Sequence, residues 1–229
     1  MIEKIRVGPI GLNCYLVKQN AGNEHAVTRN SVPLVIVDPG AEAKTIVERA
    51  LAVQTGGRVL IALTHGHLDH TGALPEVKAM LEQAGCMVSV GINQADAAYM
   101  GKQARETNER IFRGINAIGY FRKFFTEMPD PDFYFEHGSV LPGTTIKVLH
   151  TPGHTLGSCS FYCEDERSVL TGDTMFLDGR GRTDNFDSDE ILLLESITQV
   201  LFSLPDDTKA YPGHGDETVL KHEKRYYSM

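Results

Sequence analysis

Short apolar runs separated by turn-forming residues make up the first part of the chain. Residues 2–7, 13–19 and 33–38 are short strand-like runs, and they predict three successive strands. The polar, turn-rich stretch 20–32 predicts a long hairpin loop between the second and the third strand. Residues 58–64 are nearly all apolar, which is typical of a strand that is buried on both faces.

Two of these strands are followed by stretches whose apolar residues have the spacing of a helix. The stretch 38–56 has apolar residues at helical spacing, and Gly56 is a stop signal. The stretch 73–85 repeats the pattern with Pro75 in its first turn, where proline is tolerated. Residues 86–91 then predict another strand.

Residues 93–135 interrupt this rhythm. They predict one or two helices with loops, that is, a helical insertion. Within it, residues 120–125 (YFRKFF) are aromatic and basic. Such a segment packs on the core, forms a dimer contact, or covers an active site as a lid, and the sequence leaves these alternatives open.

The strand pattern returns in the last part of the chain. It predicts strands over 145–150, 158–164, 167–172 and 208–213, and helices over 188–204 and 216–226. No linker-like stretch separates the two parts. We therefore predict that residues 1–229 form one α/β (α+β) domain of mixed strands and helices.

Composition and charge narrow the range of functions. The chain has 22 Lys and Arg against 30 Asp and Glu, a net charge of −8, which argues against nucleic acid as a partner. It has neither a signal-like N-terminus nor an apolar run near the ~18 residues that span a bilayer. We therefore expect a cytoplasmic protein without a membrane partner, whose four cysteines are reduced thiols.

The stretch THGHLDHTG, residues 64–72, contains several residues that can bind metal ions. His65, His67 and His70 lie within six residues together with Asp69. Imidazole and carboxylate are both ligands for divalent metal ions near neutral pH. Gly66 allows a tight turn, through which His65 and His67 can converge on one ion.

Three further ligand-type residues follow predicted strands. His154, Asp173 and His214 each lie just past a strand end with glycine beside them. The full set of five histidines and two carboxylates suits two divalent ions, typically Zn²⁺, with iron or manganese as alternatives. The remaining histidines are in polar loops, at a strand end or in the last helix, and we expect none of them to bind metal: His25, His137, His150 and His222.

Seven stretches, in order, resemble those of a known family: NCYLV, VDPG, THGHLDHTG, TPGHTLGS, TGDTMF, GRGRTD and YPGHG. With them the chain resembles the metallo-β-lactamase superfamily, and within it the short glyoxalase II-like (hydroxyacylglutathione hydrolase-like) enzymes. The resemblance implies a four-layer αββα sandwich with the metals at one edge of the two sheets. It also implies His65, His67 and His154 on the first ion, Asp69, His70 and His214 on the second, and Asp173 bridging both.

The implied activity is hydrolysis of a small thioester or other acyl substrate. A water shared by two such ions has its pKa lowered toward ~7, so a metal-bridging hydroxide can attack the acyl carbonyl. Asp69 would orient that hydroxide or take its proton. Arg180 is a candidate anchor for a substrate carboxylate, Phe121 and Phe124 are candidate substrate contacts from the insertion, and Arg182 is expected to brace its own loop through Asp184.

Two departures from the family pattern bear on the substrate. Gly66 stands where glyoxalase II has a further histidine, and the chain stops fifteen residues after His214, where glyoxalase II continues into glutathione-binding helices. We therefore expect weak binding of glutathione thioesters, with the hydrolytic step retained. Asp173 stands where one class of β-lactamases has cysteine, which argues against that class.

Two other functions stay open at this point. The first is a persulfide dioxygenase, whose relatives share a GRGRTD-like stretch and hold one iron through two histidines and one aspartate, here His65, His154 and Asp173. The second is another hydrolase of the same fold, acting on a lactone or a phosphodiester. A homodimer is also compatible with the sequence.

Overall fold

A computed structural model describes residues 1–19, 32–54 and 57–227. The predicted hairpin loop over 20–32 lies outside the described residues except for its last residue, and so do His25 and the stop signal Gly56. In the described part of the chain, strands and helices alternate as the hydrophobic pattern predicts.

The first half of the chain builds a six-stranded sheet. β1, β2 and β3 pair antiparallel, and β3 to β6 run parallel to one another. In sheet order the strands are β1 (Ile2–Val7), β2 (Leu12–Val17), β3 (Leu34–Val37), β4 (Arg58–Ala62), β5 (Met87–Asn93) and β6 (Phe133–Phe135).

The second half builds a five-stranded sheet, in which β9 and β12 are parallel and the other neighbours antiparallel. Its order is β13 (Thr218–Val219), β12 (Lys209–Pro212), β9 (Ser168–Gly172), β8 (Cys159–Cys163) and β7 (Lys147–His150). A two-stranded hairpin, β10 (Met175–Phe176) and β11 (Gly179–Arg180), follows β9.

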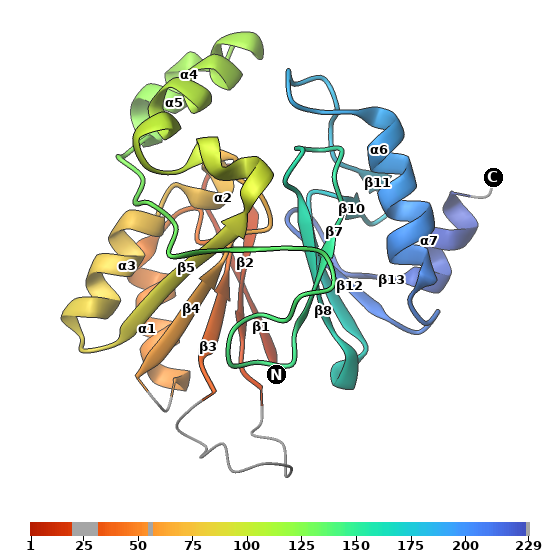
Figure 1. The fold of residues 1–229 in the computed structure, drawn as a ribbon, viewed down its shortest axis with the longest axis horizontal. Coiled ribbons are helices and arrows are strands. Elements are labelled where there is room, and N and C mark those ends of the chain that lie inside the picture. The colour runs from red at the N-terminus through yellow and green to blue at the C-terminus, as the bar shows by residue number, and fades with distance from the viewer. Residues whose placement is uncertain (20–31, 55–56, 228–229) are drawn as a thin grey trace.

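Helices cover the outer face of each sheet, so the layers run helix, sheet, sheet, helix (Figure 1). α1 (Ala43–Val53) and α3 (Leu74–Gln83) pack on the first sheet. α6 (Glu190–Glu195) and α7 (Leu220–Tyr226) pack on the second. This arrangement confirms the predicted αββα sandwich.

Alternation of side chains along the strands explains the layers. In β2, Cys14 and Leu16 face the helices, whereas Tyr15 and Val17 face the other sheet, and all four are buried. Because successive side chains of a strand point to opposite faces, a strand buried on both sides must be apolar throughout. β4 meets this condition after Arg58, as its sequence predicts.

The insertion over 93–135 lies mostly above one end of the first sheet (Figure 1). It consists of two short 3₁₀ segments, η1 (Gln94–Tyr99) and η2 (Gly101–Gln103), then α4 (Ala104–Gly114) and α5 (Ile118–Phe124). The two predicted helices are present, but the segment ends in β6, which is paired with β5. Strand β6 was missed because three residues are too few to show a period.

Two other elements differ from the sequence pattern. The helix predicted over 188–204 is α6 followed by a π turn, η4 (Ser196–Val200), and a 3₁₀ turn, η5 (Leu201–Ser203). The helix predicted over 216–226 begins only at Leu220, after the short strand β13. Within the described ranges no helix is both long and apolar enough to cross a membrane. The four cysteines are buried free thiols, as predicted.

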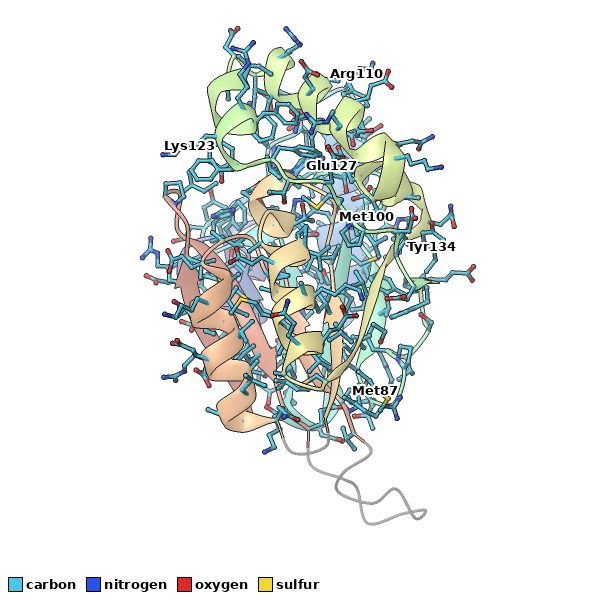
Figure 2. The ribbon with its side chains drawn as sticks, turned by 90° about the vertical axis from the view of Figure 1, so that its left-hand side faces the viewer. Met87, Met100, Arg110, Lys123, Glu127 and Tyr134 are labelled. Carbon is cyan, nitrogen blue, oxygen red and sulfur yellow. The ribbon has the colours of Figure 1, made fainter. Side chains whose placement is uncertain are left out.

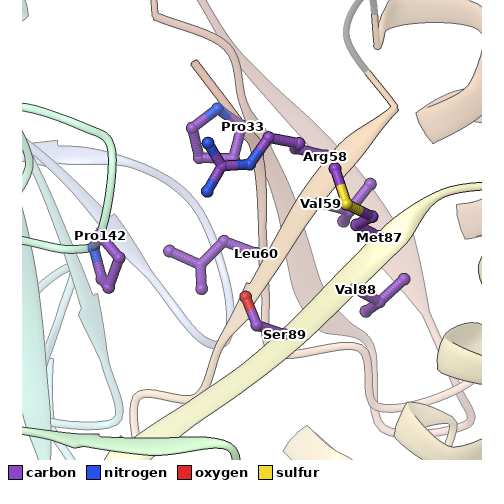
Figure 3. A pocket seen from close by; sticks show the side chains of 8 residues that line it. All are labelled: Pro33, Arg58, Val59, Leu60, Met87, Val88, Ser89 and Pro142. Atoms are coloured by element: carbon purple, nitrogen blue, oxygen red, sulfur yellow. The ribbon is translucent and has the colours of Figure 1, made fainter. Parts of the chain in front are cut away.

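A hollow of about 260 Å³ lies where β4 and β5 begin (Figure 3). Arg58 and Met87, the first residues of these two strands, line it together with Pro142 from the other half of the chain. The insertion follows the opposite, carboxyl ends of the strands, and Met87 lies far from Arg110 of α4 in Figure 2. This hollow is therefore remote from the ligand-type residues described next.

Candidate metal centre

Strand ends deliver the seven ligand-type residues to one place. His65 and His67 follow β4, Asp69 and His70 lie in the short helix α2 (Leu68–Thr71), and His154 follows β7. Asp173 and His214 directly follow β9 and β12, which are parallel neighbours and so end at the same edge. The structure brings all seven together in three overlapping groups that could each hold a metal ion.

The first group consists of His65, His67 and His154, all buried. His154 Nε2 lies 2.9 Å from His67 Nδ1. Burial, reinforced by the neighbouring histidines, lowers the pKa of His65 well below its ordinary value and that of His67 to about 3. Both rings are therefore neutral at physiological pH, which is the form that binds metal.

The second group consists of Asp69, His70 and His214. Asp69 Oδ2 lies 3.2 Å from His214 Nε2 and 3.6 Å from His70 Nε2. Burial opposes ionisation of Asp69, but His70 and His214 outweigh it and hold its pKa well below the ordinary value. The Asp69 carboxylate is therefore ionised at neutral pH.

Asp173 faces both groups. Its Oδ1 lies 3.3 Å from His70 Nε2, and its Oδ2 lies 3.7 Å from His154 Nε2 and 3.8 Å from His214 Nε2. Gly213 permits this approach, because a Cβ at that position would lie 2.4 Å from Asp173 Oδ1. A single carboxylate in this position can contribute one oxygen to each of two ions.

The donor atoms themselves indicate that the site is built for metal. His65 Nε2, His70 Nε2 and Asp173 Oδ1 are buried and have no hydrogen-bond partner among the described residues. A buried polar atom without a partner costs on the order of 1–3 kcal/mol, so native structures rarely keep several in one place. The donor chemistry of the seven residues therefore fits two divalent ions.

Asp38 orients the second group from behind, and sequence reasoning missed this role. Its Oδ2 lies 2.8 Å from His70 Nδ1 and accepts a hydrogen bond of 2.6 Å from Thr64 Oγ1. Its Oδ1 accepts from the Thr64 backbone N–H at 2.8 Å. This arrangement leaves Nε2 of His70 to face the ion. In the sequence, Asp38 directly follows the buried strand β3 and lies in the stretch VDPG, but neither feature shows its contact with His70.

Asp96 joins the two loops that carry the first group, and sequence reasoning missed it as well. Its carboxylate accepts hydrogen bonds from the Gly66 N–H at 2.9 Å, the Thr155 hydroxyl at 2.8 Å and the Gly157 N–H at 2.7 Å. Burial raises the pKa of Asp96 to about 6 against these bonds. No local motif marks this residue, which lies in η1 at the start of the insertion.

Gly66 has a role beyond the predicted turn between His65 and His67. A Cβ at this position would lie 2.2 Å from the ring of Tyr99, so glycine is required by a close approach between two chain segments. The Tyr99 ring also packs edge-on against His67, with 5.6 Å between centroids. The Tyr99 hydroxyl donates to Asp187 Oδ2 at 2.5 Å, which ties the insertion to the loop after β11.

The two arginines of GRGRTD are engaged in ion pairs. Arg182 binds Asp184 through two hydrogen bonds of 2.6 and 2.7 Å, as predicted, and its backbone oxygen accepts from His154 Nδ1 at 2.9 Å. Arg180 binds Glu190 at 2.5 Å and does not line the cavity above the metal centre. Its role as a substrate anchor stays a prediction.

The centre opens into a cavity of about 340 Å³. Apolar and aromatic side chains line one part of it: Ile10, Ile111, Phe112, Ile115, Ala117 and Tyr120. Ligand-type and other polar side chains line the rest: His67, Asp69, His154, Asp173, Arg182, Asn185 and His214. Phe121 is buried against Phe112, and neither it nor Phe124 lines the cavity. Their predicted contact with substrate stays untested, and Phe112 and Tyr120 hold the lining positions.

Three of the histidines that were expected to lie outside the metal centre are in the described part of the chain, and they lie away from it. His137 Nδ1 accepts a hydrogen bond from the His150 backbone N–H at 3.2 Å. His222 on α7 lies 2.5 Å from Asp178 in the β10–β11 turn. None of these three belongs to the groups around Asp173, but His222 forms a separate group with Asp178 and Glu223 that could hold an ion, so its expected lack of metal stays a prediction.

Comparison with known proteins agrees with the fold and the centre. Residues 7–214 match the model of the metallo-beta-lactamase superfamily. The chain is 33% identical to the hydroxyacylglutathione hydrolase GloC of Haemophilus influenzae, over 98% of this chain and 95% of that protein.

Two solved structures are similar over nearly the whole length. The BLEG-1 B3 metallo-beta-lactamase has a TM-score of 0.79 at 28% identity, covering 98% of this chain and 97% of that one. TTHA1623 in a di-iron-bound form has a TM-score of 0.76 at 28% identity, covering 98% of each chain. The chain belongs to the metallo-β-lactamase superfamily, and within it to the metallo-hydrolases.

Proposed function

We propose that the protein is a binuclear metal-dependent hydrolase of small thioesters, of the hydroxyacylglutathione hydrolase type. The observation that carries the proposal is the position of Asp173, which faces two complete donor groups at the floor of a cavity of about 340 Å³. The similarity to GloC over almost the entire chain supports a thioester as the substrate.

Two divalent ions held by these residues would supply a Lewis acid for the acyl carbonyl and a water whose pKa is lowered to about 7. Asp69 lines the cavity as a carboxylate, so it can accept a proton from a water held there. Burial and the nearby Asp69 raise the pKa of Tyr120 to about 12, so its hydroxyl stays protonated and can donate a hydrogen bond to a substrate oxygen. Zn²⁺ is the ion that we propose, with iron and manganese as alternatives.

The donor set favours hydrolysis over the mononuclear iron dioxygenase. His65, His154 and Asp173 would suffice for one iron. That arrangement would leave Asp69, His70 and His214 as a second donor group of three residues within 4.8 Å of one another and without an ion. Two ions would use all seven ligand-type residues, which is why the donor set favours the binuclear hydrolase.

The test is steady-state thioester hydrolysis, followed by release of free thiol, with zinc-, manganese- and iron-loaded protein in parallel. We expect turnover of lactoylglutathione and of other small thioesters. Oxygen consumption with glutathione persulfide is measured on the same preparations. Turnover of persulfide, with no thioester cleaved in any metal form, would replace the hydrolase by the dioxygenase.

A further inference from the structure

A second hollow of about 350 Å³ adjoins the cavity above the metal centre. Ile111, Ile115 and Asn185 line both spaces, so these three residues form the boundary between them. The remaining walls of the second hollow are Arg110 and Gly114 of α4 and Asp184 and Phe186 of the loop after β11. A ligand that is longer than the metal cavity can therefore extend past these three side chains into the second hollow.

Arg110 is the distinctive group of this second hollow. Its guanidinium lies 3.8 Å from the centroid of the Phe186 ring, and the described residues offer it no carboxylate partner. Phe186 is 49% exposed, so its ring is accessible from the hollow that it lines. A guanidinium over the face of a ring does not use its N–H groups in an ion pair, so they can bind a carboxylate. Figure 2 shows Arg110 among the helices at the upper end of the molecule.

The other charges around the two spaces are already paired. Arg182 lines the metal cavity but is bound to Asp184 through both of its hydrogen bonds. The same contact neutralises Asp184, the one carboxylate among the described residues that line the second hollow. Arg110 thus leaves a positive charge there, for which the described residues supply no partner of opposite sign.

The walls of the metal cavity indicate which half of a substrate extends outward. Ile10, Phe112 and Ala117 line the first cavity, so a small uncharged acyl group can lie against them. The thiol half would then pass Ile111 and Ile115 toward Arg110.

We propose that the second hollow is a subsite for the carboxylate of the substrate's thiol half, with Arg110 as the residue that selects it. The inference rests on the proposed thioester hydrolysis, and it assigns the class of thiol, one that carries a carboxylate remote from the sulfur. Arg110 acts in binding and not in the chemical step, so its effect falls on KM.

The experiment compares two thioesters with the same acetyl group. S-acetylglutathione carries carboxylates on its thiol half, and S-acetyl-N-acetylcysteamine carries none. We expect Arg110→Met to raise KM for the first by about tenfold with kcat nearly unchanged, since a charge-assisted bidentate contact is lost. KM for the second should not change. High ionic strength should raise KM of the wild-type protein for the first substrate alone.

Arg113→Met is the matched control. Arg113 lies one turn further along α4, is 62% exposed, and pairs with Glu109 instead of facing the hollow. Its replacement should leave both KM values unchanged. Equal effects of the two variants, or no effect of Arg110→Met on either substrate, would overturn the subsite while leaving the proposed hydrolysis intact.

A binding measurement decides the subsite even if no thioester is cleaved. S-methylglutathione has the same thiol half and cannot be hydrolysed, and its affinity for the metal-loaded protein is measured by calorimetry. We expect about tenfold weaker binding to Arg110→Met than to the wild type or Arg113→Met. Absent binding to the wild type, or equal binding to all three, would refute the subsite.

Discussion

Asp38 holds the imidazole of His70 through a contact of 2.8 Å between Oδ2 and Nδ1, and both side chains are fully buried. The backbone of Asp38 has a φ of +53°, an uncommon value for a residue other than glycine. The chain therefore accepts local strain to place this carboxylate behind a metal ligand. A partner of this kind fixes both the tautomer and the orientation of the ring.

Replacing Asp38 by asparagine should weaken metal binding more than folding. The amide keeps the volume and a hydrogen bond but removes the charge that supports His70, so we expect metal affinity about 10–100-fold lower. Competition with a chromophoric chelator measures this. Lys102→Gln is the control, because it also removes one charge but at an exposed position. Unchanged affinity in Asp38→Asn would show that the contact does not support a ligand.

Replacing Asp173 by alanine should affect both ions at once. The change removes the one carboxylate that faces both donor groups. We expect metal content to fall from nearly two ions per chain under metal-replete conditions, and hydrolysis to be lost. Elemental analysis together with the thiol-release assay measures both quantities. His137→Ala, at an exposed histidine away from the centre, should change neither, and equal behaviour of the two variants would refute the assignment.

The ligands could be predicted because each lies next to a feature that is visible locally. His65 follows the apolar run of β4, and His214 follows β12, so recognising the strands also located the ligands. Asp38 also follows a strand end, but its contact with His70, 32 residues away in sequence, forms only in the folded chain, and Asp96 lies next to no such feature. Asp96 contacts Gly66 and Gly157, which are 30 and 61 residues away in sequence, and only the folded chain brings them together.

The same reasoning explains why sequence analysis did not identify the aromatic residues that line the cavity. The aromatic residues of α5 were predicted as one group, but a helix turns its side chains in different directions. Tyr120 lines the cavity, whereas Phe121 is buried against Phe125 with 4.8 Å between ring centroids. Which face of α5 is turned toward the cavity depends on how the insertion packs on the rest of the protein. The sequence of this short helix alone does not encode that packing.

The contact between His222 and Asp178 should make the stability of the C-terminal region depend on pH. The hydrogen bond to Asp178 raises the pKa of His222 above its ordinary value. Its stabilising effect is therefore fully present below about pH 6.5, the ordinary pKa of histidine, and is lost as the pH rises through the raised pKa. An NMR titration of the His222 ring should give a lower pKa in Asp178→Asn, where asparagine also tolerates the left-handed backbone (φ +52°). The same pKa in both proteins would contradict the contact.

Replacing Asp96 by alanine should destabilise the fold and weaken the first donor group together. The change leaves the buried N–H groups of Gly66 and Gly157 without their acceptor, whereas the Thr155 hydroxyl keeps Ser158 Oγ as a partner at 2.8 Å. Because each unpaired buried donor costs on the order of 1–3 kcal/mol, we expect the free energy of unfolding to fall by about 2–5 kcal/mol. Urea denaturation of the metal-free protein measures this, and Asp207→Ala, at an exposed residue paired with Arg167, should stay within about 0.5 kcal/mol of the wild type. A metal titration should show weakened binding of at least one ion, because the two loops that carry His67 and His154 lose their link. Wild-type stability in Asp96→Ala would show that these loops hold their positions without the carboxylate.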